Sequence, residues 1–324
     1  MSLPPKIIIL IGFQASTKST AAQEILSNVS NSVLLSRDTE GGKVEQLISK
    51  TEEHIKNGKV VIIDNTNLTK ATRKLFIDIA KKHKVRVDGQ YFKTTVEDCL
   101  TRHMKRMYEK FGEIYQTGKG PKKDPHCFGS VVLYKARKDL EEPTKDEGFN
   151  SLVMRAVQPI TWDKNVYKNK ALFLDIDGTL RVTEHLPNKY PTHPDEVQLI
   201  RPAATMKDKL QSYRKAGYHL IGVSNQSGIA KGTVTQGQVD EIFDRTRQLI
   251  GFTKEEFPIL YCPHSSFPAS CFCRKPGVGM AMEAIMKLKL DPEECTMVGD
   301  MKTDEEMAKR LNIKYIDVNE FWNS

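Results

Sequence analysis

The sequence lacks most of the features that mark secreted, membrane or repetitive proteins. Its 324 residues include only six cysteines, and no apolar run approaches the ~18 residues that a membrane-spanning helix needs. No signal peptide opens the chain, and there is no internal repeat or low-complexity block. These absences argue against a disulfide scaffold, a helical membrane protein and a repeat array. We therefore expect a soluble, intracellular protein of a reducing compartment, with no membrane partner.

The chain is long enough for two ordinary domains, each with a core of its own. Both halves alternate apolar, strand-like runs with segments of helical period, which predicts an α/β fold with two doubly wound parallel sheets. Functional groups then belong at the carboxyl ends of the strands. A polar stretch near residues 157–169 separates two sets of motifs. We therefore predict domains over residues 1–157 and 168–324.

The most informative segment, Leu172 to Leu180, reads LFLDIDGTL. It predicts a buried strand that delivers Asp175 and Asp177 at its carboxyl end, on one face because strand side chains alternate. Gly178 then lets the backbone turn away sharply. Two converging carboxylates are unfavourable without a cation, so the pair predicts a bound Mg²⁺. The alternative is a buried strand that happens to end in an acidic turn.

Three later segments extend this pattern. The run Tyr218 to Gly228 is strand-like and brings Ser224 and Asn225, Arg274-Lys275-Pro276 follows a cysteine cluster, and MVGDMKTD brings Asp300 and Asp304. In this order the motifs resemble those of the haloacid-dehalogenase phosphatase superfamily, over residues 168–324.

That resemblance implies an aspartyl-phosphate mechanism. Asp175 is the implied nucleophile, and Asp177 is the implied general acid that later activates water. The other implied roles are phosphate binding by Ser224, Asn225, Arg274 and Lys275, and Mg²⁺ binding by Asp175, the backbone carbonyl of Asp177, and Asp300, with support from Asp304.

The cysteine cluster has the spacing of a metal site. Cys262, His264, Cys271 and Cys273 offer three thiolates and one imidazole, which suit a closed, structural Zn²⁺ site. The alternative is two disulfides, or free thiols beside a stray histidine. The loop 262–273 is similar to the zinc loop of the heptose-bisphosphate and histidinol-phosphate phosphatases, whose substrates are small molecules. The resemblance implies that zinc orders the loop that carries Arg274 and Lys275. The other three cysteines are expected to be inert thiols: Cys99, Cys127 and Cys295.

The front half opens on a degenerate phosphate-binding loop. Residues 6–12 form an apolar strand that ends at Gly12, and Lys18 and Ser19 follow at the spacing of the G-x-x-x-x-G-K-[ST] template. Thr17 stands where the template has its second glycine, and a β-branched residue resists the backbone angles that glycine allows. Taken alone, the segment is equally compatible with an ordinary strand–turn–helix.

The surroundings of this loop are more specific. The motifs that follow are Ser36-Arg37-Asp38-Thr39, Asp64-Asn65-Thr66-Asn67, Arg102 and Arg106, Tyr134-Lys135, Glu142-Pro143-Thr144 and Glu147-Gly148-Phe149. In order, they resemble the kinase domain of polynucleotide kinase-phosphatases, over residues 5–156. Gln14-Ala15 stands where that family usually has Pro-Gly.

This second resemblance implies an ATP-dependent 5′-hydroxyl kinase. Asp38 is the implied general base, and Lys18 and Arg106 neutralise charge on the transferred phosphoryl group. The remaining implied roles are nucleotide binding by Gly12, Thr17, Lys18 and Ser19, with Ser19 on the Mg²⁺ of ATP, and substrate binding by Arg37, Arg102 and Asp64. The alternatives are a helix N-cap for Asp38 and a solvated helix face for the arginines.

The chain has a net charge of +8, which is compatible with a polyanionic partner. The loop Lys119–Lys123 is a candidate for contact with a nucleic-acid backbone, although an ordinary solvated lysine loop explains it as well. Together the motifs predict an end-healing enzyme that removes a 3′-phosphate and phosphorylates a 5′-hydroxyl of DNA or RNA, which leaves ends that a ligase can join.

Two rival interpretations stay open at this stage. The zinc loop favours a phosphatase of sugar bisphosphate or histidinol phosphate, fused to a small-molecule kinase. The departures around Thr17 favour a phosphatase whose kinase domain is vestigial and serves only to bind nucleic acid.

Overall fold

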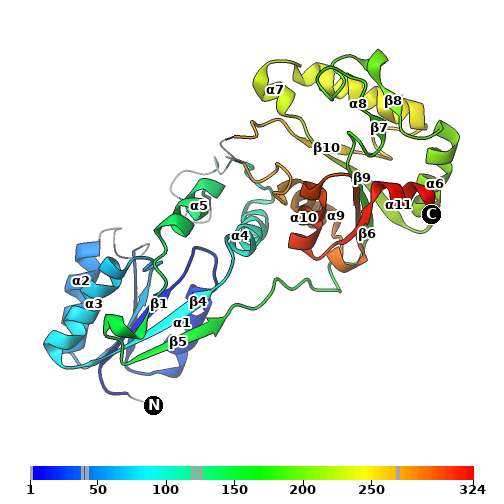
Figure 1. The fold of residues 1–324 in the computed structure, drawn as a ribbon. Helices are drawn as coiled ribbons and strands as arrows, with labels where there is room; N and C mark the ends of the chain where they lie inside the picture. The colour runs from blue at the N-terminus through cyan, green and yellow to red at the C-terminus, as the bar shows by residue number, and fades with distance from the viewer. Residues whose placement is uncertain are drawn as a thin grey trace. The chain divides into compact units, whose positions relative to one another are not determined.

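A computed structural model describes residues 3–37, 40, 44–117, 120, 124, 127–267 and 271–324. The chain divides into two compact units, Met1–His103 with Val131–Ile160, and Met104–Ser130 with Thr161–Ser324. Each unit is built on a five-stranded parallel sheet (Figure 1), which confirms the predicted fold class. Among the described residues, no helix is long and apolar enough to cross a membrane.

In the first unit the strand order is β2-β3-β1-β4-β5. The strands are β1 Lys6–Ile11, β2 Ser32–Ser36, β3 Val60–Asp64, β4 Arg86–Lys93 and β5 Ser151–Ala156. The helices are α1 Lys18–Asn28, α2 Val44–Lys56, α3 Lys70–His83, α4 Val96–Phe111, α5 Ser130–Asp139 and the 3₁₀ turn η1 Lys145–Glu147. The residues of α4 after His103 belong to the second unit.

Strand β1 is apolar from Ile7 to Ile11 because both of its faces are covered. Ile7 and Ile9 pack into one cluster with buried residues of α2 and α3. Ile8 and Leu10 point the other way, into a second cluster that includes Ala22 of α1. Alternation along the strand therefore places helices on both faces, which is the doubly wound arrangement expected from continuous apolar runs.

The Glu147-Gly148-Phe149 stretch holds this unit together. Arg73 of α3 is fully buried and forms a two-pronged ion pair with Glu147, at 2.7 and 2.6 Å. Its third nitrogen donates to the carbonyls of Asn67 and Leu68. Phe149 is buried in the core beside α3. The stretch therefore ties the segment after β3 to the end of the unit, which is a structural role.

In the second unit the strand order is β10-β9-β6-β11-β12. The strands are β6 Lys170–Leu174, β9 Tyr218–Asn225, β10 Ile259–Cys262, β11 Thr296–Gly299 and β12 Lys314–Asp317, with a separate antiparallel pair of β7 Arg181–Val182 and β8 Gln198–Leu199. The helices are α6 Ala203–Lys215, α7 Ser227–Lys231, α8 Gln236–Ile250, α9 Gly279–Leu288, α10 Lys302–Leu311 and α11 Val318–Asn323, and the 3₁₀ turns are η2 Pro194–Glu196 and η3 Pro292–Glu294.

Strand β6 lies in the middle of this sheet, between β9 and β11. Figure 1 shows α9 and α10 on one side of it and α6 and α11 on the other. The chain order reverses at β6, so the carboxyl ends of β6 and β11 meet at a topological switch point, where open α/β sheets bind their ligands. Asp175 follows β6 and Asp300 follows β11, so both acids arrive at this point.

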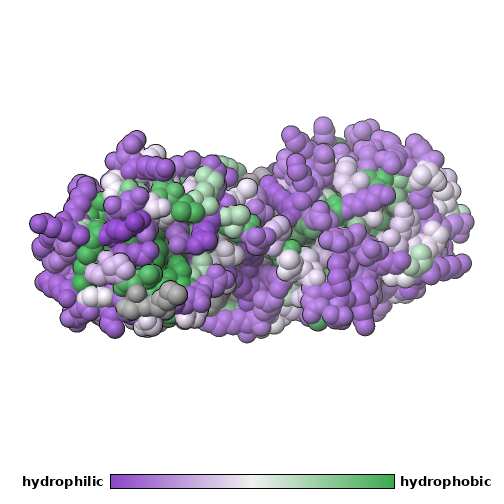
Figure 2. Space-filling view, turned by 90° about the horizontal axis from the view of Figure 1, so that it is seen from below, coloured by the Kyte–Doolittle hydropathy of each residue, from purple (hydrophilic) through white to green (hydrophobic). Residues whose placement is uncertain are grey.

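The surface on the face drawn in Figure 2 is mostly hydrophilic, with apolar residues in smaller groups. This agrees with a composition in which 28% of the residues are charged.

Candidate active sites

Asp175 is positioned by the backbone of the central strands. Its N–H donates to the carbonyl of Val298 at 2.9 Å, and the residue is only 5% exposed. The turn after it requires Gly178, which has a φ of 88°. A Cβ at Gly178 would also collide with the carboxylate of Asp300. Glycine therefore lets the acids after β6 and β11 come together.

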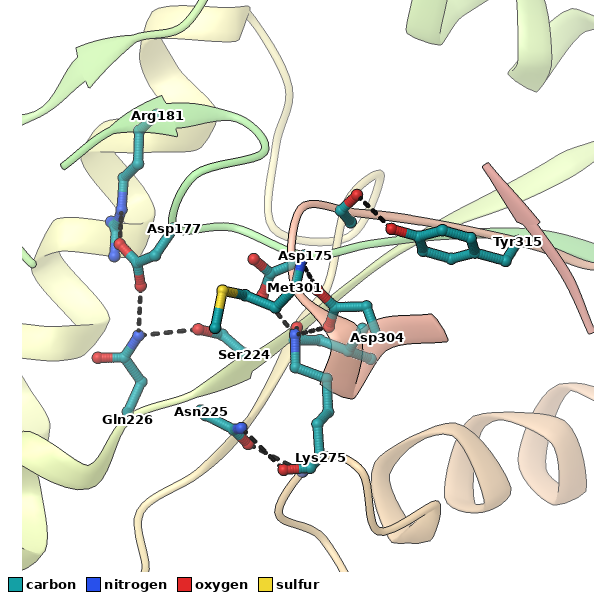
Figure 3. Close-up of polar contacts among 12 residues, drawn as sticks. Asp175, Asp177, Arg181, Ser224, Asn225, Gln226, Lys275, Met301, Asp304 and Tyr315 are labelled. Carbon is teal, nitrogen blue, oxygen red and sulfur yellow. Dashed lines mark hydrogen bonds and ion pairs between the residues drawn. The ribbon is translucent and has the colours of Figure 1, made fainter. Parts of the chain in front are cut away.

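Lys275 is the cation of this site (Figure 3). Its buried ammonium group forms ion pairs with Asp175 and with Asp304, the latter at 2.7 Å, and donates to the carbonyl of Val223 at 2.8 Å. Burial lowers the pKa of Lys275, but the charges of the two acids outweigh burial and the net shift is upward. Lys275 therefore remains a cation where a phosphoryl group would bind.

The acids of the site fit a divalent cation. One carboxylate oxygen each of Asp175, Asp300 and Asp304 lie within 4.8 Å of one another. Burial raises the pKa of Asp175 to about 8, although the charge of Lys275 opposes the shift. Three carboxylates and one ammonium leave two negative charges, which one Mg²⁺ neutralises with the oxygen ligands that it prefers. Such an ion would favour the ionised form of Asp175, the form that a nucleophile needs.

Asp177 lies on the other side of the site, held by two side chains that the sequence motifs did not reveal. Arg181, buried beneath it, donates to one carboxylate oxygen at 2.7 Å and to Thr246 at 3.2 Å. Gln226 donates to the other oxygen at 2.9 Å and to Ser224 at 2.8 Å (Figure 3). These contacts fix the direction of the Asp177 carboxylate.

The predicted phosphate-binding residues take different positions. Ser224 is buried beside Gln226, and Lys275 points into the acids. Asn225 accepts from the backbone N–H of Lys275 at 2.9 Å and donates to its carbonyl at 3.1 Å, so its amide holds the Lys275 segment. One terminal nitrogen of Arg274 is buried without a hydrogen-bond partner among the described residues. The sequence motifs named these four residues together, but they did not indicate that each one makes different contacts.

The predicted zinc ligands converge. One ligand atom from each of Cys262, His264, Cys271 and Cys273 lies within 4.8 Å of the others. The Sγ atoms of Cys262 and Cys271 are 3.7 Å apart, far beyond a disulfide bond, and none of the three cysteines of the cluster forms a disulfide. Two thiolates on one tetrahedral Zn²⁺ lie about 3.8 Å apart at ordinary Zn–S distances. The donor set therefore fits a four-coordinate zinc, and these cysteines are not joined by disulfides in this structure.

The loop after β1 has the shape of a phosphate-binding loop. Gly12 donates to the carbonyl of Thr66 at 3.0 Å, and a Cβ there would press on Phe92 of β4 at 3.2 Å. The ammonium of Lys18 folds back onto the carbonyls of Gly12 and Phe13, at 3.0 and 2.5 Å. Lys18 therefore lies inside the curve of the loop, where the phosphate of a nucleotide would bind. Ser19 is exposed in the first turn of α1.

Thr17 adopts the backbone that the template reserves for glycine. Its φ is 69° and its ψ is 11°, and Ala15 has a φ of 59°. The left-handed conformation costs an L-residue about 1–2 kcal/mol, and most when it is β-branched. The departure from the template therefore strains the loop while leaving its path intact.

We expect Thr17→Gly to raise the free energy of unfolding by about 1 kcal/mol, and also to tighten ATP binding. The matched control is Thr20→Gly, three residues later inside α1, which is expected to lower stability by about 0.5–1 kcal/mol. Urea unfolding of both variants checks this prediction. Equal losses of stability at the two positions would contradict the strain at Thr17.

The structure describes some of the other residues predicted for the kinase, but not all of them. Asp38 and most of the loop Lys119–Lys123 lie outside the described residues. Asp64 ends β3 in register with Leu10 and Ser36, so it lies at the same sheet edge as the loop after β1, and Arg37 follows Ser36. Arg102 is mostly buried and donates to the carbonyl of Gln158 at 2.7 Å, and Arg106 is half-buried on the same helix.

Two family profiles match the chain. Residues 7–115 match a family described as AAA domain, and residues 170–322 match one described as Polynucleotide kinase 3 phosphatase. The C-terminal part of the chain, residues 170–322, belongs to the polynucleotide kinase 3 phosphatase family. The member described here is an enzyme with a haloacid-dehalogenase-type phosphatase domain, preceded by a kinase-like domain. Each profile falls on one of the two sheets.

The phosphatase half of this family member is similar to curated bacterial enzymes. It is 35% identical over 142 residues to D-glycero-beta-D-manno-heptose-1,7-bisphosphate 7-phosphatase of Haemophilus influenzae, covering 42% of this chain and 73% of that protein. The Escherichia coli (strain K12) enzyme of the same name is 33% identical over 157 residues, covering 44% and 75%. The assignment of this half to the haloacid-dehalogenase superfamily rests on its similarity to these relatives.

Two solved structures are similar at a lower level. The D,D-heptose 1,7-bisphosphate phosphatase of B. bronchiseptica, complexed with magnesium and phosphate, is 24% identical with a TM-score of 0.38, covering 45% of this chain and 78% of that one. A chain of the Pnkp1/Rnl/Hen1 complex is 17% identical with a TM-score of 0.35, covering 98% and 97%.

Proposed function

We propose that this protein is a bifunctional end-healing enzyme of DNA or RNA. Its C-terminal half removes a 3′-phosphate, and its N-terminal half transfers a phosphoryl group from ATP to a 5′-hydroxyl. The observation that carries the proposal is the buried Asp175 between Lys275 and the acids Asp300 and Asp304. A buried acid, a buried cation and two further acids are the groups that a phosphomonoesterase needs. The same chain also carries, in its N-terminal half, a loop with the shape of a phosphate-binding loop.

The phosphatase reaction follows from the positions of two acids. The carboxylate of Asp175 attacks phosphorus, the ester P–O bond breaks, and the leaving oxygen takes a proton from Asp177. Water then attacks the aspartyl-phosphate and loses its proton to Asp177, and phosphate leaves Asp175. Lys275 and Ser224 hold phosphoryl oxygens. Asp175, Asp300 and the backbone carbonyl of Asp177 would hold a Mg²⁺, which would supply positive charge at the phosphoryl group.

The kinase roles are those that the resemblance of the motifs implies for these residues, and only Lys18 and Ser19 among them lie at the loop after β1. Lys18 and Arg106 neutralise the transferred phosphoryl group, Ser19 holds the Mg²⁺ of ATP, and Asp38 takes the proton of the attacking 5′-hydroxyl. Phosphoryl transfer depends mainly on positioning and electrostatics, so few residues suffice. The strained Thr17 is compatible with weak ATP binding, and hence with the alternative in which this domain only binds nucleic acid.

Nucleic acid is the substrate class that the combination of domains favours. A phosphatase domain described by its polynucleotide activity follows a kinase-like domain in one chain, and the net charge is +8. Removal of a 3′-phosphate and addition of a 5′-phosphate produce the two ends that a ligase joins. A ligase is therefore the partner enzyme that would consume the product.

A second candidate follows from the relatives of the phosphatase half. Those relatives are named for heptose bisphosphate, a small molecule, so the phosphatase half could act on sugar bisphosphates.

Comparing kcat/KM for an oligonucleotide 3′-phosphate and for heptose 1,7-bisphosphate tests the proposal. We expect the oligonucleotide to be preferred by at least about tenfold, and the preference to shrink with added salt because backbone contacts release counterions. A preference for the sugar would overturn the nucleic-acid assignment and leave the phosphatase chemistry intact.

A further inference from the structure

Gln116 lies outside the phosphatase segment predicted from the sequence, yet it contacts the loop that carries Lys275. It follows α4 by five residues and belongs to the same compact unit as the phosphatase sheet. Its backbone carbonyl accepts the N–H of Phe272 at 2.8 Å. Its side-chain amide donates to Glu283 at 3.2 Å and to the carbonyl of Gly279 at 3.4 Å.

These contacts fall on the two ends of one closed loop. The N–H of Gly279 donates to the carbonyl of Phe272 at 2.9 Å, so this hydrogen bond brings together the two ends of the loop 272–279. Between the ends lie Cys273 of the predicted zinc cluster and Lys275 of the acid cluster. Gln116 therefore binds the base of the loop, with its backbone on one end and its side chain on the other.

The fit at this base is close. The side-chain oxygen of Gln116 is buried, and a Cβ on Gly279 would overlap it. The segment before Gln116 is fixed as well, because the N–H of Tyr115 donates to the sulfur of Met107 at 3.1 Å. Lys110 of α4 also pairs with Asp124 at 2.7 Å. The contact is thus a packed, hydrogen-bonded junction within one unit.

We propose that Gln116 is a positioning residue for the phosphatase. By fixing the base of the loop 272–279, it sets the depth at which Lys275 enters the acid cluster, and so the distance between the Lys275 ammonium and Asp175. The phosphatase domain then needs residues 104–130 in addition to residues 168–324. The inference rests on phosphatase chemistry and is independent of whether the substrate is nucleic acid.

The first test removes only the side-chain contacts of Gln116, which are those with Gly279 and Glu283. Gln116→Ala in the full-length chain keeps the backbone bond to Phe272. With 4-nitrophenyl phosphate, we expect kcat to fall about tenfold while KM stays within about twofold, because small displacements of catalytic groups act on the transition state. Zinc should also leave faster to a chelator, since the loop 272–279, whose far end the Gln116 side chain holds at Gly279, carries the predicted ligand Cys273. Gln248→Ala, on an exposed face of α8, is the matched control and should change neither quantity.

The second test separates positioning from general damage. Gln116→Glu places a carboxylate against Glu283, and we expect a larger loss of kcat than with alanine. Adding Glu283→Gln restores a donor–acceptor pair with the roles exchanged, and should recover most of that loss. Glu283→Gln alone should cost little.

The outcomes are distinct. Parental kcat in both Gln116 variants overturns the proposal, and so does a Gln116→Glu variant that Glu283→Gln fails to rescue. If Gln116→Ala does not fold, the rescue alone decides. Failure of the proposed function would appear elsewhere, as an unmodified protein that leaves an oligonucleotide 3′-phosphate in place.

Discussion

Asp175→Asn is expected to abolish phosphate release from every phosphomonoester. The loss should be on the order of 10⁴-fold or more, because an amide cannot form the aspartyl-phosphate on which turnover depends. The side chains have nearly the same shape, and Asp175 is buried against Lys275, so the variant should fold. The measurement is phosphate release in the presence of Mg²⁺, with circular dichroism to verify the fold.

The matched control is Asp244→Asn. Asp244 is an exposed acid of α8 that pairs with the buried Arg247, away from the acid cluster. It should keep parental turnover. A rate for Asp175→Asn that matches this control would contradict the assignment of the nucleophile.

Loss of the predicted zinc is expected to have the second largest effect. Structural Zn²⁺ contributes about 10–16 kcal/mol of binding free energy in small zinc domains, and much of it orders the chain around the metal. Here that chain continues directly into Lys275. Cys273→Ser should therefore lower the zinc content from one per chain to near zero and reduce phosphatase turnover by at least about a hundredfold.

Elemental analysis and phosphatase assays check this prediction, with ATP binding as the readout for the front half. Cys295→Ser is the control, since Cys295 is buried outside the cluster and burial raises the pKa of its thiol to about 12. It should keep its zinc. Full phosphatase activity in zinc-free Cys273→Ser would show that the loop holds Lys275 without a metal.

Local patterns predicted much of this structure. Apolar runs that end in Asp175 and Asp300 indicated two buried strands, and parallel strands bring their carboxyl ends to one edge. The spacing of Cys262, His264 and Cys271 within a dozen residues indicated a cluster, because a short loop keeps its members close. The conformation of Thr17 was also foreseeable, since the template position demands a backbone that glycine favours.

Contacts that depend on tertiary packing were not predictable in the same way. Arg181 is only four residues from Asp177, yet nothing in that spacing indicates that it turns beneath the carboxylate and is buried against α8. The pairing of Arg73 with Glu147 spans 74 residues. Gln116 reaches Glu283 across 167 residues. Such pairs depend on how complete elements pack, which no periodicity in one segment encodes.

The most direct test of the central claim uses one oligonucleotide that carries a 3′-phosphate and a 5′-hydroxyl, with labelled ATP. The parental protein should change both ends. Asp175→Asn should lose only removal of the 3′-phosphate, and Lys18→Ala, with Asp38→Asn beside it, should lose only labelling of the 5′ end. Removal of the 3′-phosphate at the parental rate by Asp175→Asn, or loss of both activities from either kind of variant, would contradict two independent sites in one chain.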